Sequence, residues 1–145
     1  MGDIRMLKYN RTNVYDFNFH LVFVTKYRKN IFTNEQARSV MKDILYTIAN
    51  NNNTEIEYIE VMPDHVHMML SFSPKQTPSS IVKSFKGTSA REWFKQFPET
   101  KEQLWGGHLW SHSYFMSTLG NVSKEVVAKY IENQLTEYNS GRSRH

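Results

Sequence analysis

The chain contains no cysteine among its 145 residues, only six glycines and four prolines, and no long apolar run. Without cysteine there are neither disulfides nor thiolate ligands, so any bound metal must be held by nitrogen and oxygen atoms. Residues 1–11 lack the apolar core of a signal peptide, and no segment approaches the roughly 18 apolar residues of a membrane span. We therefore expect a soluble cytoplasmic protein that does not bind membranes.

The residues that are present are typical of one folded domain. Hydrophobic residues make up 39% of the chain and charged residues 22%. We expect residues 1–145 to form a single domain whose ends, 1–12 and 140–145, are flexible. The formal net charge is +4 and the isoelectric point about 9.3, which suits a polyanionic partner without requiring one.

Hydrophobic periodicity predicts strands that alternate with helices. The expected strands are Tyr15–Lys26, 55–62, the segment after Pro63-Asp64, and Leu109–Thr118. The expected helices are one with Thr33 as N-cap that ends within 50–53, one from the Thr77-Pro78 cap to about Lys95, and one from about Ser123 to Tyr138. Residues 98–107 are expected to be a loop.

This order of elements predicts an α+β fold, the ferredoxin-like or RRM-like βαββαβ pattern with an added C-terminal helix. In that pattern the first and third strands lie side by side at the centre of a four-stranded antiparallel sheet. The two inner helices cover one face of the sheet. The other face stays open, and such folds commonly use it for chemistry or for nucleic acid.

Two histidines, His65 and His67, stand one residue apart at the start of the third strand. Alternation along a strand places both on one face and Val66 and Met68 on the other. Since the apolar residues must face the helices, the histidines are expected on the open face, where His20 of the first strand can join them. Two such rings, about 6.5–7 Å apart at Cα, can reach one divalent cation if a third ligand is supplied. Alternatively, both are ordinary, partly exposed strand residues.

The last helix carries Tyr130 and Gln134, four residues apart and therefore neighbours on one helix face. It is the remaining element that can cover the open face of the sheet, in its own chain or in a partner subunit. A simpler interpretation is an amphipathic helix that docks through a tyrosine.

Basic residues gather in two places that suit phosphate contacts, although a solvated surface explains such clusters as well. The candidates are Lys26, Tyr27, Arg28 and Lys29 after the first strand, and Lys83, Lys86 and Arg91 on the second helix. Tyr27 or Trp93 can stack on an unpaired base, with the hydrophobic core favoured for Trp93.

The segment His65-Val66-His67 resembles the His-hydrophobic-His motif of HUH endonucleases, and Tyr130-Ile131-Glu132-Asn133-Gln134 is similar to the tyrosine helix of TnpA-type single-tyrosine transposases. These are the transposases of small IS200/IS605-like insertion sequences. The resemblance extends over about 15–138, with further similar segments at 15–29, 86–91 and 117–120.

This resemblance implies a DNA transposase that cleaves and rejoins single-stranded DNA, recognises hairpins near the element's ends and acts as a homodimer with shared active sites. Tyr130 would be the nucleophile and would form a 5′-phosphotyrosine intermediate. His65, His67 and Gln134 would hold a divalent metal, Mg²⁺ or Mn²⁺, between which the ligands do not decide. In the family, the histidines of one subunit work with the tyrosine helix of the other.

Three alternatives stay open at this point. The chain can be a domesticated relative that acts on repeated genomic palindromes, which sequence does not separate from self-mobilisation. It can be a non-catalytic module that binds single-stranded nucleic acid, which predicts exposed aromatic residues on the central strands. A metal-dependent phosphodiesterase that uses activated water would not need Tyr130.

Overall fold

The computed structural model describes residues 18–72, 75–117 and 129–133. The strands are β1 (Asn18–Val24), β2 (Thr54–Met62), β3 (His65–Phe72) and β4 (Phe115–Ser117), and the long helices are α2 (Glu35–Asn51) and α3 (Pro78–Gln96). Three short 3₁₀ helices are η2 (Lys26–Arg28), η3 (Pro98–Gln103) and η4 (Trp105–Gly107), and residues 129–133 are also helical. Within these residues no helix is long and apolar enough to cross a membrane.

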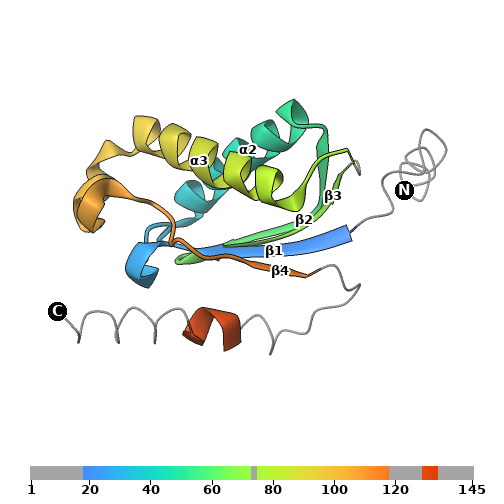
Figure 1. Cartoon of the computed structure of the whole chain (residues 1–145). Helices are drawn as coiled ribbons and strands as arrows, with labels where there is room; N and C mark the ends of the chain where they lie inside the picture. Colours follow the sequence, from blue (N-terminus) through green and yellow to red (C-terminus); the bar gives the residue numbers. More distant parts are fainter. Residues whose placement is uncertain (1–17, 73–74, 118–128, 134–145) are drawn as a thin grey trace.

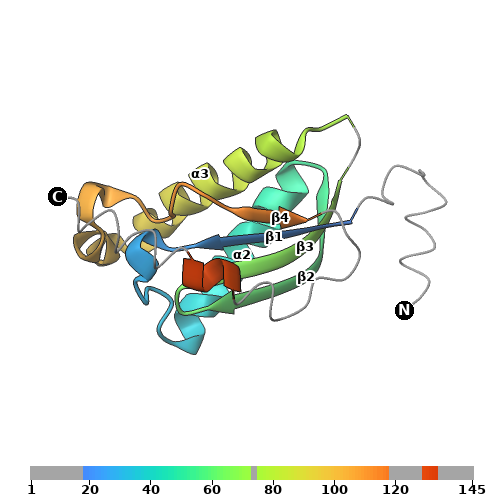
Figure 2. The same ribbon diagram turned by 60° about the horizontal axis from the view of Figure 1, so that its bottom comes forward.

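The four strands form one antiparallel sheet in the order β2-β3-β1-β4. Helices α2 and α3 cover one face of this sheet, and the helical residues 129–133 lie on the opposite side (Figure 1). Turning the molecule brings that second face forward and shows the short helix over the sheet (Figure 2). The predicted ferredoxin-like α+β fold, with the first and third strands at the centre, is therefore confirmed.

Strand β1 separates two hydrophobic clusters because its side chains alternate between the faces of the sheet. Phe19, Leu21 and Phe23 belong to the main core beneath the helices. Val22 and Val24 face the other way and form a smaller cluster with buried Ile131. Apolar residues on both faces of a central strand give the helix at 129–133 a surface to bury against.

Helix α2 begins one residue later than predicted. Asn34, not Thr33, is the N-cap, and its side chain accepts a hydrogen bond from the backbone N–H of Ala37 at 2.8 Å. Asparagine is the better N-cap residue of the two. The predicted Thr77 cap of α3 is confirmed, since its hydroxyl accepts from the N–H of Ser80 at 3.2 Å.

The first and fourth strands are shorter than predicted. Strand β1 ends at Val24, because η2 turns the chain away from the sheet, and residues 15–17 lie outside the described part. Most of Leu109–Thr118 is irregular; β4 covers only Phe115–Ser117, and Thr118 lies outside the described part. Trp110 makes a single bridge with Thr25 and turns its indole inward. The predicted loop 98–107 contains two short helices, η3 and η4.

A bulge in β2 decides which side chains reach the open face of the sheet. The pairing between β2 and β3 shifts between Ile56 and Tyr58. After the shift, Ile59 and Val61 pack on the core, while Tyr58 and Glu60 lie beside the histidine strand on the open face. Simple alternation along the sequence does not predict this change of phase.

Replacing Trp93 by alanine is expected to lower the free energy of unfolding by about 3–5 kcal/mol. The side chain is fully buried, its ring stacks on Phe97 at 4.2 Å between centroids, and its Nε1–H donates to Thr100 Oγ1 at 3.0 Å. Urea unfolding followed by circular dichroism measures the loss. Trp105→Ala is the matched control and should cost less than about 0.5 kcal/mol, because that indole is 84% exposed. Equal losses for the two variants would contradict the core assignment.

Candidate active site

His65 and His67 lie on the open face of β3, as their spacing predicts. Both are partly buried, whereas Val66, Met68 and Leu70 between and after them are fully buried on the helix-covered face. The predicted face is thus confirmed. Their role as metal ligands stays a prediction.

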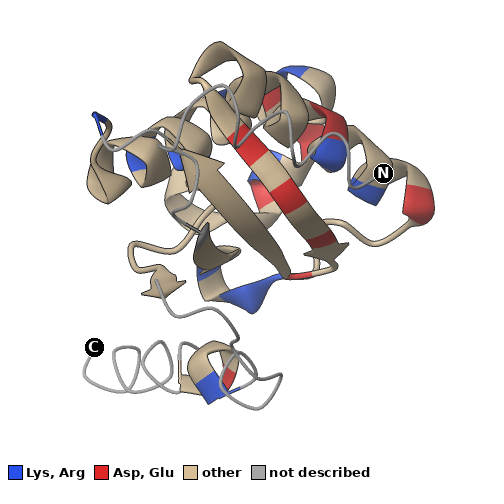
Figure 3. Ribbon diagram, turned by 90° about the vertical axis from the view of Figure 1, so that its right-hand side faces the viewer, with Lys and Arg blue, Asp and Glu red and all other residues tan. Residues whose placement is uncertain are grey.

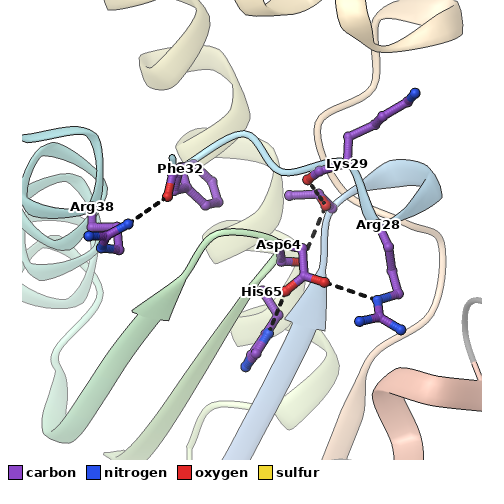
Figure 4. A network of polar contacts seen from close by, with 7 residues as sticks. Arg28, Lys29, Phe32, Arg38, Asp64 and His65 are labelled. Carbon is purple, nitrogen blue, oxygen red and sulfur yellow. Dashed lines mark hydrogen bonds and ion pairs between the residues drawn. The ribbon is translucent and has the colours of Figure 1, made fainter. Parts of the chain in front are cut away.

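A short ion-pair chain orients His65 (Figure 4). Arg28 Nε donates to Asp64 Oδ2 at 3.0 Å, and Asp64 Oδ1 accepts from His65 Nδ1 at 2.9 Å. Burial would raise the pKa of Asp64, but the hydrogen bonds from His65 and Arg28 outweigh it and hold that pKa below its ordinary 3.8. Because an ionised carboxylate only accepts, the proton of His65 lies on Nδ1, and Nε2 is the atom that can bind a cation.

His67 is surrounded by polar and aromatic groups from both neighbouring strands. Its Nε2 lies 3.2 Å from His20 Nδ1, and its ring centroid is 5.5 Å from that of Tyr58. Glu60 of β2 is its paired residue in the sheet. Burial lowers the pKa of His67 below 6.5, and the neighbouring charges of His20 and His65 lower it further against the opposing charge of Glu60. His67 is therefore a neutral imidazole near pH 7, the form that binds metals.

The turn that carries the histidines is fixed by main-chain hydrogen bonds. The N–H groups of Ile31 and Phe32 both donate to the carbonyl of Pro63, at 2.9 and 3.0 Å. The N–H of Thr25 donates to the carbonyl of Asp64 at 2.9 Å, and the Thr25 hydroxyl donates to the carbonyl of Lys29 at 2.7 Å. Residues 25–32 therefore hold the Pro63-Asp64 turn in place.

Tyr130 also lies on the open face, but toward the β4 side. Its ring is 5.6 Å from that of Phe115, and its hydroxyl is 3.2 Å from Ser113 Oγ. Val22 of β1 pairs with both His67 and Phe115, so these two residues are separated by two strand spacings, about 9–10 Å at Cα. Gln134, the predicted third ligand, lies outside the described residues.

The ligand set is incomplete within the described residues. No group of three His, Cys, Asp or Glu side chains there could hold a metal ion. Two imidazoles with a carboxylate behind His65 do suit a divalent cation, provided that a further ligand comes from elsewhere. His67 Nε2 would have to exchange its contact with His20 for the ion, and we therefore retain His20 as an accessory residue.

The predicted DNA-contacting residues fall into two groups. The residues of η2 and the exposed Lys29 adjoin the histidine turn, whereas the second group lies on α3: Lys83, Lys86 and Arg91. Lys83 and Arg91 are exposed. Lys86 is partly buried instead, and its Nζ donates to the carbonyls of residues 111, 112 and 113. Burial and the nearby Lys26 lower the pKa of Lys86. Lys86 therefore ties α3 to the segment before β4.

Sequence reasoning missed four neighbours of the proposed catalytic groups: Asp64, Tyr58, Glu60 and Ser113. Asp64 could have been predicted from the sequence, since it directly precedes the first histidine. The other three depend on strand register and on an irregular segment, which the sequence pattern does not reveal.

Asp64→Asn is expected to weaken metal binding and DNA cleavage by about 10- to 100-fold, because a carboxylate behind a histidine fixes its tautomer and raises its basicity. Titration of Mn²⁺ and cleavage rates at fixed metal concentration measure the effect. Asp43→Asn, an exposed position on α2, is the matched control. Unchanged metal affinity in Asp64→Asn would show that this carboxylate only holds Arg28.

Residues 13–134 match the family described as "Transposase IS200 like". The chain belongs to this family. It is therefore a transposase of the IS200/IS605 type, and members of such families cut and rejoin DNA.

Two relatives of this transposase illustrate the similarity. It is 44% identical over 128 residues to the ISDra2 transposase TnpA of Deinococcus radiodurans. The aligned residues cover 88% of this chain and 91% of the relative. It is 34% identical over 142 residues to the transposase for insertion sequence element IS200 of Salmonella typhimurium. Here the aligned residues cover 97% of this chain and 90% of the relative.

Two solved structures share its fold. A crystal structure of a candidate transposase from Deinococcus radiodurans R1 superposes with a TM-score of 0.77 at 40% identity, over 83% of this chain and 92% of the other. A REP-associated tyrosine transposase bound to a REP hairpin gives a TM-score of 0.54 at 13% identity, over 75% and 59% of the two chains. At that identity the second likeness shows the fold alone.

Proposed function

We propose that this transposase cleaves and rejoins single-stranded DNA at the ends of an insertion sequence, with Tyr130 as the nucleophile. The observation that carries the proposal is the common placement of the groups needed. His65, His67 and Tyr130 all lie on the face of the sheet that α2 and α3 leave open.

The proposed reaction is a transesterification. Tyr130 Oη attacks a backbone phosphorus, the bond to the 3′-oxygen breaks, and the phenol proton is lost as the leaving oxygen gains one. The products are a 5′-phosphotyrosine and a free 3′-hydroxyl. Attack by a 3′-hydroxyl on the phosphotyrosine reverses the step and restores the phenol, so rejoining needs no nucleotide cofactor.

His65, His67 and Gln134 are the proposed ligands of a divalent metal, Mg²⁺ or Mn²⁺. When bound, such an ion offsets charge that develops on the phosphate oxygens. The residues of this chain prepare the site for it. Asp64 holds His65 with Nε2 available, and burial keeps His67 neutral.

The position of Tyr130 supports an active site shared between two subunits. In its own chain the phenol contacts Ser113 and Phe115, and Phe115 lies two strand spacings from His67 at Cα. We propose a homodimer in which the tyrosine helix of one subunit works with the histidines of the other. The contact with Ser113 would then hold Tyr130 when it is not against the histidines of the partner subunit.

The distribution of charge supports a path for the DNA strand across the protein surface. Acidic residues follow the edge strand β2, at Glu55, Glu57 and Glu60 (Figure 3). A phosphate backbone is repelled there and attracted to the basic residues of η2 on the other side of the histidine turn. We propose that the strand to be cut passes over η2, and that hairpin DNA near the element's ends is the wider partner.

Covalent capture tests the proposed reaction. We would incubate the protein with Mn²⁺ and single-stranded DNA from a flanking element end, labelled in turn at each end, and separate the products on a denaturing gel. A protein adduct that retains the label 3′ to the cut, with no adduct on duplex DNA, is the expected result. Cleavage without an adduct would favour water as the nucleophile. Binding without cleavage, across several element ends, would favour a non-catalytic module.

The DNA that flanks the gene distinguishes self-mobilisation from the role of a domesticated relative. Excision of flanking DNA that carries hairpins would support self-mobilisation. Cleavage only of dispersed genomic palindromes would support a domesticated relative.

A further inference from the structure

Trp105 differs from the other two tryptophans of the chain. Trp93 and Trp110 are buried, and their indole N–H groups donate to Thr100 Oγ1 and Ser89 Oγ. Trp105 is 84% exposed, at the start of η4. An exposed indole contributes none of the stabilisation that burial of such a large apolar side chain would give. The position is therefore a candidate binding site.

This indole lines a cleft of about 910 Å³ between η2 and the segment 101–107. Tyr27 and Lys29 form one side, and Lys101 and Trp105 are on the other. The same elements gather at one end of the molecule in Figure 1. The cleft therefore combines two aromatic side chains with two cations and one carboxylate, that of Glu102.

Three residues that line the cleft have positive φ values. Tyr27 has a φ of 58°, and Gly106 and Gly107 have φ values of 86° and 72°. A Cβ on Gly107 would lie 3.1 Å from Lys101 Cε. The positive φ values at 106 and 107 favour glycine in the turn that follows Trp105, whereas the flexible Lys101 side chain could shift to admit a Cβ.

We propose that this cleft binds an unpaired base of single-stranded DNA, with Trp105 and Tyr27 as stacking surfaces and Lys29 and Lys101 as contacts to its phosphates. Aromatic rings beside cations are the usual means of holding single strands without reading duplex grooves. Lys26 Nζ already lies 5.5 Å from the centroid of the Tyr27 ring, which adds positive charge to the same side.

The cleft is joined to the histidine site through one short segment. Lys29 lines the cleft, and its carbonyl accepts from Thr25, whose N–H donates to Asp64. Arg28, next to Tyr27, donates to the carboxylate of Asp64. A base bound against η2 would therefore lie close to the histidine site, with the acidic edge strand β2 on the far side of β3. This inference rests on the proposed function, because it assumes a single-stranded DNA substrate.

Fluorescence titration with a thymidine oligonucleotide tests the subsite with the full chain. Stacking should quench the exposed indole on binding. Trp105→Ala should weaken binding of the oligonucleotide about 5- to 150-fold, and Trp105→Phe should retain most of the affinity. Tyr46→Ala, which removes a 46% exposed ring from α2, is the matched control. Lys101→Ala should reduce the slope of log affinity against log salt by about 0.7.

The outcomes separate this inference from the proposed reaction. Unchanged oligonucleotide affinity in Trp105→Ala would overturn the subsite, whether or not a covalent adduct forms. A change in sedimentation of Trp105→Ala without a change in DNA affinity would overturn it too, because the indole would then serve contacts between copies of the chain. If the wild-type protein binds as expected but forms no adduct on element ends, the nucleophile is wrong and the subsite stands.

Discussion

Tyr130→Phe is expected to abolish the covalent adduct and to reduce cleavage of single-stranded DNA by more than about 1000-fold, because the substitution removes the attacking oxygen. The phenyl ring can still pack on Phe115 and leaves buried Ile131 in place, so the fold should persist. The substitution removes the contact of the hydroxyl with Ser113 Oγ at 3.2 Å. Gel analysis of labelled DNA measures both the adduct and the cleavage.

Tyr114→Phe is the matched control for that experiment. Tyr114 is an exposed phenol in the segment just before β4, one residue from Ser113. It should form adduct at the wild-type rate. Cleavage that persists in Tyr130→Phe at more than a tenth of the wild-type rate would exclude Tyr130 as the nucleophile and leave water as the alternative.

His67→Ala is expected to reduce metal-dependent cleavage by more than about 100-fold, since it removes a proposed ligand at the centre of the open face. Removal of metal from the wild-type protein with a chelator should have the same effect and be reversed by Mn²⁺. In His67→Ala, added Mn²⁺ should restore little activity. Tyr58→Phe, which keeps the ring beside His67 and removes only a hydroxyl, is a control for disturbance of the surroundings.

Mixing the two inactive variants tests whether active sites are shared. If histidines and tyrosine come from different subunits, a dimer of Tyr130→Phe with His67→Ala contains one intact site. Random exchange in an equal mixture makes half of the dimers mixed, so about one quarter of the wild-type activity should return. If each chain uses its own tyrosine, no mixed dimer contains an intact site, and the mixture stays inactive.

The sequence was sufficient to predict the arrangement of the sheet and the face that carries the histidines. Both depend on alternation of apolar residues in the central strands, as in Phe19, Leu21 and Phe23, which any antiparallel sheet must bury on one side. The order of the elements then leaves few topologies to consider.

The surroundings of the site could not be predicted in the same way. The neighbours of His67 depend on the bulge between Ile56 and Tyr58, which places Tyr58 and Glu60 beside it. Lys86 looks like one more basic residue of α3, yet its partners are carbonyls about 25 residues further along the chain. Such contacts are set by tertiary structure and leave no periodic pattern in the sequence.

Besides the side chains of Thr25 and Arg28, main-chain hydrogen bonds that do not depend on side-chain identity hold the turn that carries His65. The carbonyl of Pro63 accepts from the N–H groups of Ile31 and Phe32, and that of Asp64 accepts from the N–H of Thr25. Any residue other than proline can donate such a bond. The side chains at 26, 27 and 29 can therefore change during evolution while the histidines keep their positions. The DNA contacts proposed for these positions can therefore change without disturbing the histidine turn.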